Sequence, residues 1–124
     1  MAVQKIGTVS AHIAALLGLS SAVNMPILIG ASNIEHMKTS HPADYEKYGD
    51  QISMIVNDPD YVGMNQSDGS IEYVKEYKID DEYVKVAVRI STKGQYYARS
   101  LYVLNNKRVH NFIKKGTLKL VDKA

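Results

Sequence analysis

Two histidines stand close together in the first half of the chain and are its best candidates for proton transfer. His36 and His41 lie in the segment Asn33–Pro42, and histidine can accept or donate a proton near neutral pH. A helix here puts His41 near the apolar stripe of Ile34 and Met37, whereas His36 points away from it. The alternatives are an ordinary exposed helix histidine for His36 and a helix-end residue beside the last carbonyl groups for His41.

Three cationic side chains lie on segments whose alternation predicts β-strands. Lys75, Arg89 and Arg99 occupy successive predicted strands, and a guanidinium group donates hydrogen bonds in a fork that fits phosphate. In a regular strand Arg99 shares a face with Tyr97 and Leu101, so the pattern leaves open whether it faces a cleft or the core. The alternative is a buried arginine in an ion pair. The carboxylates available for that pair are Glu72, Glu76 and Asp81.

The residue types argue against a metal centre, a bound cofactor and a cysteine nucleophile. The chain has no cysteine, and a spacing of five makes His36 and His41 a poor pair of helical ligands without a third ligand nearby. The sequence also contains no HExxH, no phosphate-binding glycine loop and no GxSxG motif. We therefore predict that the protein uses neither a metal nor a cofactor.

RNA cleavage is the one coherent chemical use for a set of histidine, arginine, lysine and tyrosine side chains without metal ligands. RNA carries its own nucleophile, so a protein need only remove the 2′-hydroxyl proton, protonate the leaving 5′-oxygen and stabilise the phosphorane charge. Lys38 is a further candidate substrate contact. The side chains of Tyr73, Tyr97 and Tyr102 can stack on a base or hydrogen-bond a phosphate.

The charge distribution also suits a phosphate-rich partner. The net charge is +2, and nine Lys or Arg residues lie between positions 85 and 119 without an Asp or Glu among them. The alternative is a solvated surface that aids solubility. No stretch approaches the roughly 20 apolar residues of a membrane span, so we expect no membrane association.

The hydrophobic period predicts one α+β domain in which helices come first and strands follow. Residues 1–25 are interpreted as an N-terminal helical extension, with a weak signal peptide as the alternative. Residues 26–118 form the expected core, in which 26–30 is a short strand and Ser32 and Glu35 form a capping box. Helices are expected at about 10–17, 32–41, 43–57 and 107–115. A four-stranded antiparallel meander is expected over 61–64, 71–79, 83–91 and 96–104.

A spaced series of motifs carries a family resemblance over about residues 26–118. The motifs are Asn33–Pro42, Asp44-Tyr45, Tyr48-Gly49, Asn57–Gly63, Ser70–Lys75, Val86–Arg89 and Arg99–Tyr102. In these the chain resembles the phage-associated Barnase–EndoU–colicin–RelE-like nuclease domains. The resemblance implies helices packed on a meander sheet, with an active site on its open face. The positions implied as catalytic are His36, His41, Lys75, Arg89, Arg99, Ser100 and Tyr102.

Three functional hypotheses follow from the residues and the resemblance together. The first is a metal-independent endoribonuclease, a phage or mobile-element toxin or effector that acts on RNA in the bacterial cytoplasm and is paired with an immunity, antitoxin or host protein. The second is a non-catalytic phage module on the same scaffold that binds nucleic acid or inhibits a host or defence protein. The third is a structural domain of a phage particle. None of the three fixes an oligomeric state.

Overall fold

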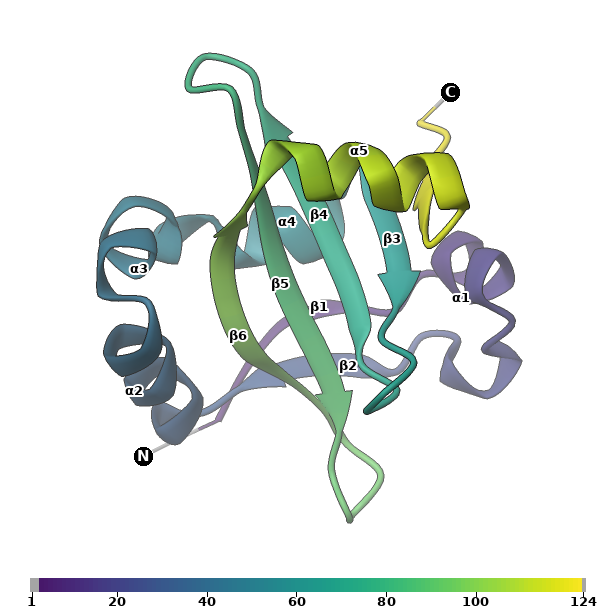
Figure 1. Cartoon of the computed structure of the whole chain (residues 1–124). Helices are drawn as coiled ribbons and strands as arrows, with labels where there is room; N and C mark the ends of the chain where they lie inside the picture. The colour runs from purple at the N-terminus through teal and green to yellow at the C-terminus, as the bar shows by residue number, and fades with distance from the viewer. Residues whose placement is uncertain (1–2, 124) are drawn as a thin grey trace.

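The computed structural model describes residues 3–123 and contains one seven-stranded mixed sheet with helices on both faces (Figure 1). The strands are β1 (Gln4–Thr8), β2 (Pro26–Ile29), β3 (Tyr61–Met64), β4 (Ile71–Tyr77), β5 (Glu82–Ile90), β6 (Tyr96–Leu104) and β7 (Leu118–Leu120). The α-helices are α1 (Ala11–Leu17), α2 (Ala31–Ser40), α3 (Pro42–Tyr48), α4 (Ile52–Asn57) and α5 (Asn106–Lys115), with 3-10 turns at Ser20–Ala22 and Gly49–Gln51.

The sheet has the strand order β1-β2-β6-β5-β4-β3-β7. Strands β3 to β6 form the predicted antiparallel meander, and β2 joins it by parallel pairing with β6 through Ile27 and Leu28. Strand β1 then pairs antiparallel with β2, and β7 pairs antiparallel with β3. The predicted α+β class is therefore present, but the prediction of a four-stranded antiparallel sheet was wrong, because three strands add to its two edges.

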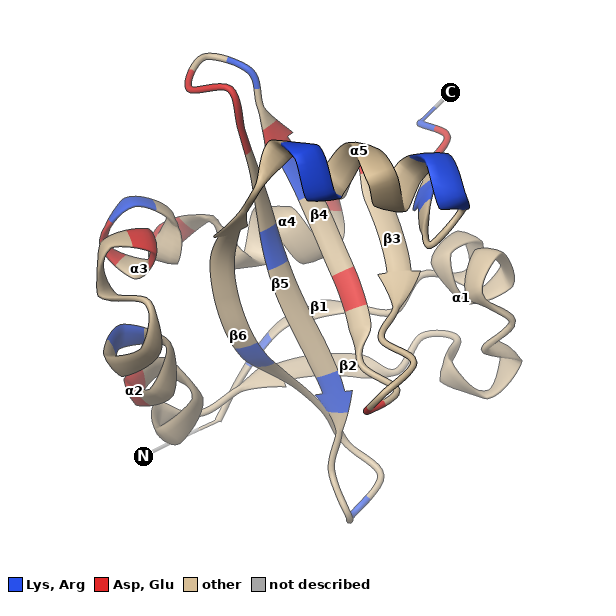
Figure 2. Cartoon of the chain, viewed as in Figure 1, with Lys and Arg blue, Asp and Glu red and all other residues tan. Residues whose placement is uncertain are grey.

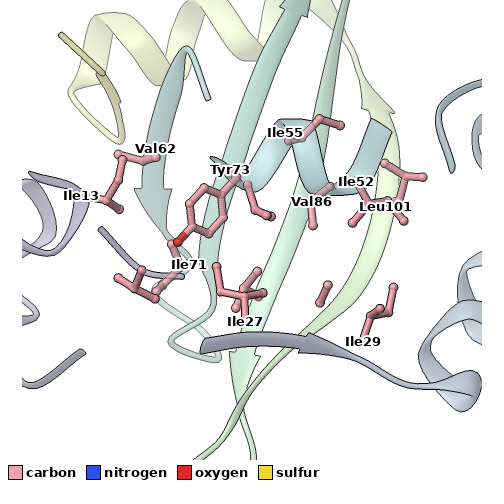
Figure 3. Packing of buried hydrophobic residues seen from close by; sticks show 14 of the residues in the cluster. Ile13, Ile27, Ile29, Ile52, Ile55, Val62, Ile71, Tyr73, Val86 and Leu101 are labelled. Atoms are coloured by element: carbon pink, nitrogen blue, oxygen red, sulfur yellow. The ribbon is translucent and has the colours of Figure 1, made fainter. Parts of the chain in front are cut away.

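The main core lies on the side of the sheet that faces α4. Figure 3 shows side chains from β2, β4, β5 and β6 and from α1 and α4 directed toward one another. Full burial of an aliphatic side chain contributes roughly 1.5–3 kcal/mol relative to exposure. The fully buried members include Ile27, Ile55, Val86 and Leu101. Val86 follows the predicted alternation, since Val84, Val86 and Val88 all point into this core.

Local capping signals explain where several helices begin and end. The Ser10 hydroxyl accepts a hydrogen bond from the Ile13 amide at 3.1 Å, and Gly18 ends α1 in the left-handed conformation, as predicted. The capping box expected at Ser32 was wrong, because the N-cap of α2 is Gly30, two residues earlier. The Asn33 side chain instead accepts a hydrogen bond from the Gly30 amide at 2.9 Å.

Segment 1–25, predicted as a helical extension, contributes to the sheet and to the core. Its described part begins with β1, whose pairing with β2 is irregular between Lys5 and Gly7. Val9 and Ile13 are buried in the same core as the central strands. The predicted helix at 43–57 is divided by a 3-10 turn at Gly49, where an added Cβ would lie 2.9 Å from the Tyr45 ring. Tyr45 packs directly over this backbone.

A candidate active site on the open face of the sheet

The face of the sheet opposite the main core is only partly covered by α5. This helix crosses in front of β4 and β5 at one end of the face (Figure 1) and buries Val109 against Val74, Tyr83 and Leu118. The remaining surface of β4, β5 and β6 is bordered by α2 and α3 along the β6 edge. Figure 2 shows that Lys and Arg positions recur along β5, β6 and α5, whereas acidic positions gather on α3 and in the β4–β5 loop.

A row of three polar side chains crosses the centre of this open face. Tyr102 on β6 lies directly opposite Lys85 on β5, and Lys85 forms an ion pair with Glu72 on β4 at 2.7 Å. The Lys85 ammonium also lies 4.6 Å from the centroid of the Tyr102 ring. Burial lowers the pKa of Lys85, but hydrogen bonding to Glu72 and Tyr102 and their charges raise it, so that the net shift is upward. Lys85 is therefore a fixed positive charge at neutral pH.

His41 extends this row beyond the edge of β6. Its ring stacks on Tyr102 with the two ring centroids 4.9 Å apart and the ring planes inclined at 26°. Two interactions fix the position of the corner between α2 and α3. The Met37 side chain is buried in the main core, and the Asp44 carboxylate accepts a hydrogen bond from the Val103 amide at 3.0 Å. That amide is free to bond Asp44 because β2 pairs with β6 only at Tyr96 and Tyr97, which leaves the rest of this edge without a strand partner.

Two arginines line a separate hollow at the other end of the open face. Arg89 and Arg99 border a hollow of about 460 Å³ together with Tyr97 and the first residues of α2. Neither guanidinium forms a salt bridge with any other residue between positions 3 and 123. The N-terminus of α2 adds backbone amides and the positive end of its dipole. These groups suit an anionic ligand.

A β-bulge determines the position of Arg99. Ala87 pairs with Ser100 and Val88 pairs with Ala98, so Arg99 is the extra residue on β6. Regular alternation would have placed Arg99 on the same face as Leu101, which is fully buried. The bulge interrupts this alternation, and Arg99 is exposed at the hollow instead. The alternative of a buried, ion-paired arginine was therefore wrong.

The β3–β4 turn also lies beside the open face. The Ser70 hydroxyl donates to Asp68 at 2.6 Å, and its backbone amide donates at 2.9 Å. These hydrogen bonds are the main reason that the pKa of Asp68 is lowered, and the positive fields of Arg89 and Lys85 lower it further. Both cations thus act on the same turn from the same side of the sheet.

Four of the predicted site residues do not lie on the open face. The exposed His36 ring approaches only the Ser40 hydroxyl at 3.4 Å, and no hydrogen bond or ring contact joins it to a strand within the described chain. Lys75 lies on the other face of β4, where its ammonium binds the Asp58 carboxylate at 3.0 Å. Tyr73 is fully buried in the core and cannot stack on a base there. Lys38 lies over the Tyr45 ring at 5.6 Å.

The remaining predicted residues are brought to one surface, together with two that were not predicted as site residues. His41, Ser100 and Tyr102 accompany the two arginines and Tyr97. The additional pair is Lys85 and Glu72, whose side chains are 12% and 13% exposed. Lys85 lies on the face of β5 opposite Val84, Val86 and Val88, and the register of β4 against β5 brings Glu72 close to it.

The described chain offers neither a metal site nor a membrane-spanning helix. No cluster of three or more His, Cys, Asp or Glu side chains suited to a metal ion is found in the part of the chain that the structure describes. None of the helices in this part has the length and apolar character needed to cross a membrane.

Comparison with known families identifies the family to which this chain belongs. A family model described as phage-Barnase-EndoU-ColicinE5/D-RelE like nuclease 3 matches residues 4–111. The chain belongs to this family of phage-associated nucleases, which confirms the resemblance seen in the motifs. Searches of curated proteins and of solved structures found no match. The match begins within the described β1, so the family domain includes the N-terminal strand and α1.

Proposed function

We propose that this protein is a metal-independent endoribonuclease whose active site is the open face of the sheet. The observation that carries the proposal is that His41 and Lys85 both contact Tyr102, on the same face as two arginines that form no salt bridge within the described chain. Family membership supports a nuclease and hence a nucleic-acid substrate. RNA is the substrate that these groups suit, because its 2′-hydroxyl supplies the nucleophile that the chain itself does not.

The proposed reaction assigns a separate role to each group. Neutral His41 accepts the 2′-hydroxyl proton as this oxygen attacks the adjacent phosphorus. The Tyr102 hydroxyl, beside the Lys85 ammonium, donates a proton to the 5′-oxygen as the P–O bond to it breaks. Arg89 and Arg99 offset the charge of the phosphorane. The products are a 2′,3′-cyclic phosphate and a 5′-hydroxyl, and proton transfer from His41 to Tyr102 through solvent restores the enzyme.

A cleavage assay with matched histidine variants tests this assignment. Purified protein and a mixed-sequence single-stranded RNA are incubated with EDTA, and wild type is compared with His41→Ala, Arg99→Ala and His36→Ala. We expect His41→Ala to lower kcat by about 10²–10⁴-fold and Arg99→Ala by about 10²–10³-fold. His36→Ala is the control, because its side chain lies away from the open face, and should remain within about twofold of wild type.

The substrate strand provides a second check on the chemistry. A strand in which every 2′-hydroxyl is replaced by hydrogen should be bound but not cleaved, because it lacks the nucleophile. Equal cleavage of RNA and DNA, loss of activity in EDTA, or equal activity of the wild-type and His41→Ala proteins would contradict the proposal. Binding of RNA without cleavage would favour a non-catalytic module on the same scaffold.

We also propose that the cleaved RNA belongs to a bacterial host cell and that the protein acts as a phage or mobile-element toxin or effector. The phage association of the family supports this setting. Expression of wild type in bacterial cells should inhibit growth, whereas expression of His41→Ala at the same level should not.

A further inference from the structure

A second hollow on the open face lies between α5 and the β3–β4 turn. It has a volume of about 530 Å³, and Lys85 and Tyr102 line it together with Gln66, Arg108 and Phe112. Tyr102 therefore borders this hollow and also stacks on His41. The hollow adjoins the proposed catalytic row from the α5 side, whereas the arginine hollow adjoins the first turn of α2.

The chemistry of this hollow differs from that of the arginine hollow. The Lys85 charge is neutralised by Glu72, which is also part of the lining. Half-buried aromatic rings are present at Tyr102 and Phe112, and the Arg108 guanidinium lies 6.0 Å from the Phe112 ring centroid. Such surroundings favour a flat and largely uncharged ligand over a free phosphate.

Amide groups supply directional hydrogen bonding at the rim of this hollow. The side-chain oxygens of Asn65 and Asn105 already accept backbone hydrogen bonds within the β3–β4 turn and at the start of α5. Their Nδ2 groups, like the Gln66 amide, make no hydrogen bond to another residue of the described chain. The unused donors therefore outnumber the acceptors, which suits the carbonyl oxygens and ring nitrogens on the edge of a base.

We propose that this hollow binds an unstacked nucleobase of the RNA strand whose phosphates occupy the arginine hollow. The inference rests on the proposed ribonuclease function and adds the recognition of one base beside the cleaved bond. Phe112 and Thr117 line the hollow but lie beyond residues 4–111 that the family model matches. A base held in a stacked duplex cannot enter, so the enzyme should prefer single-stranded RNA.

The test compares two uncleavable strands of equal length and charge. One is a mixed-sequence 2′-O-methyl RNA, and the other is an abasic ribose-phosphate strand without bases. Fluorescence anisotropy should show that wild type binds the base-bearing strand about tenfold or more tightly than the abasic strand. In Gln66→Ala/Arg108→Lys, which keeps the charge but removes the amide and the guanidinium fork, this ratio should fall below about threefold.

Matched variants separate base binding from charge and folding. Lys107→Arg/Asn111→Ala alters exposed positions of α5 outside the lining and should retain the wild-type ratio. Arg99→Ala should weaken both strands by the same factor. The proposal is overturned if wild type binds the two strands equally or binds neither. It is also overturned if Gln66→Ala/Arg108→Lys weakens binding of both strands equally.

The two proposals fail in different ways. A wild-type preference for bases without any RNA cleavage in EDTA would reject the ribonuclease and leave the base site standing. Cleavage that proceeds equally well on single-stranded and fully duplexed RNA, without a preference for bases in binding, would reject the base site alone.

Discussion

The ion pair between Lys85 and Glu72 stabilises the folded state at the centre of the open face. We expect Glu72→Gln to destabilise the fold, because the substitution keeps the shape of the side chain but leaves the Lys85 charge without its partner. The two atoms are 2.7 Å apart and the side chains are only 12% and 13% exposed. Removing one partner of a fully buried pair costs about 3–5 kcal/mol. With this residual exposure we expect a loss of about 2–3 kcal/mol.

A double-mutant cycle isolates the pair from the surrounding packing. Lys85→Met removes the charge and retains an apolar stem, so the double variant Glu72→Gln/Lys85→Met no longer buries an unpaired ammonium. We expect it to be about 1 kcal/mol less stable than wild type, and hence more stable than Glu72→Gln alone. Urea unfolding at pH 7, followed by circular dichroism, measures each corner of the cycle.

The pH dependence of the same pair has a defined sign. The folded-state pKa of Lys85 is raised above the ordinary value of 10.5. Its contribution is therefore fully present below that ordinary value and is lost as the pH rises through the folded-state pKa. The stability difference between wild type and Glu72→Gln should be constant from pH 6 to 9 and should narrow above pH 10.5. The reasoning would be refuted if the losses of unfolding free energy in the two single variants were additive in the double variant. It would also be refuted if Glu72→Gln lowered the free energy of unfolding by less than about 0.5 kcal/mol.

Three further predictions concern the elements around the site. Gly63→Ala should lower the free energy of unfolding in urea by about 2–3 kcal/mol, because an added Cβ would clash with the Thr117 carbonyl oxygen beside β3. A variant as stable as wild type would show that β7 is not packed there. Asn33→Ala should lower the free energy of unfolding by about 1 kcal/mol and weaken the first turn of α2, because the Gly30 amide loses its acceptor. Asn33→Asp retains an acceptor and should therefore keep most of the wild-type stability. Hydrogen bonds from two lysines, with a minor contribution from their charges, lower the pKa of Asp58 below 3.8. Its contribution to stability is therefore present above pH 3.8 and lost as the pH falls through the folded-state pKa. The stability difference between wild type and Asp58→Asn should accordingly shrink between pH 5 and pH 2, and a difference that grows on acidification would contradict this assignment.

The secondary structure that depends on local signals could be predicted from the sequence. Ser10 and Gly18 delimit α1, Gly116 ends α5 in the left-handed conformation, and period-two alternation locates the four strands of the meander. Each of these signals acts through neighbours within a few residues, so it is readable without knowledge of the remaining chain. The family resemblance rests on motifs of the same local kind.

The candidate site could be predicted only in part, because it depends on pairing between distant segments. The helical period separates His41 from His36, and the structure places the two rings in different surroundings. The apolar stripe that carries His41 packs against β6, so this histidine reaches Tyr102, whereas His36 stays at the surface.

The sequence by itself determined the residue types, the order of helices and meander strands and the basic character of the last third of the chain. Tertiary structure alone decided that β1, β2 and β7 extend the sheet, that a bulge exposes Arg99, and that Glu72 meets Lys85. Strand register and bulges are set by contacts between segments far apart in sequence, and a shift of one residue reverses the face of every side chain. For this reason the candidate residues could be named from the sequence, whereas their assembly on one open face could not.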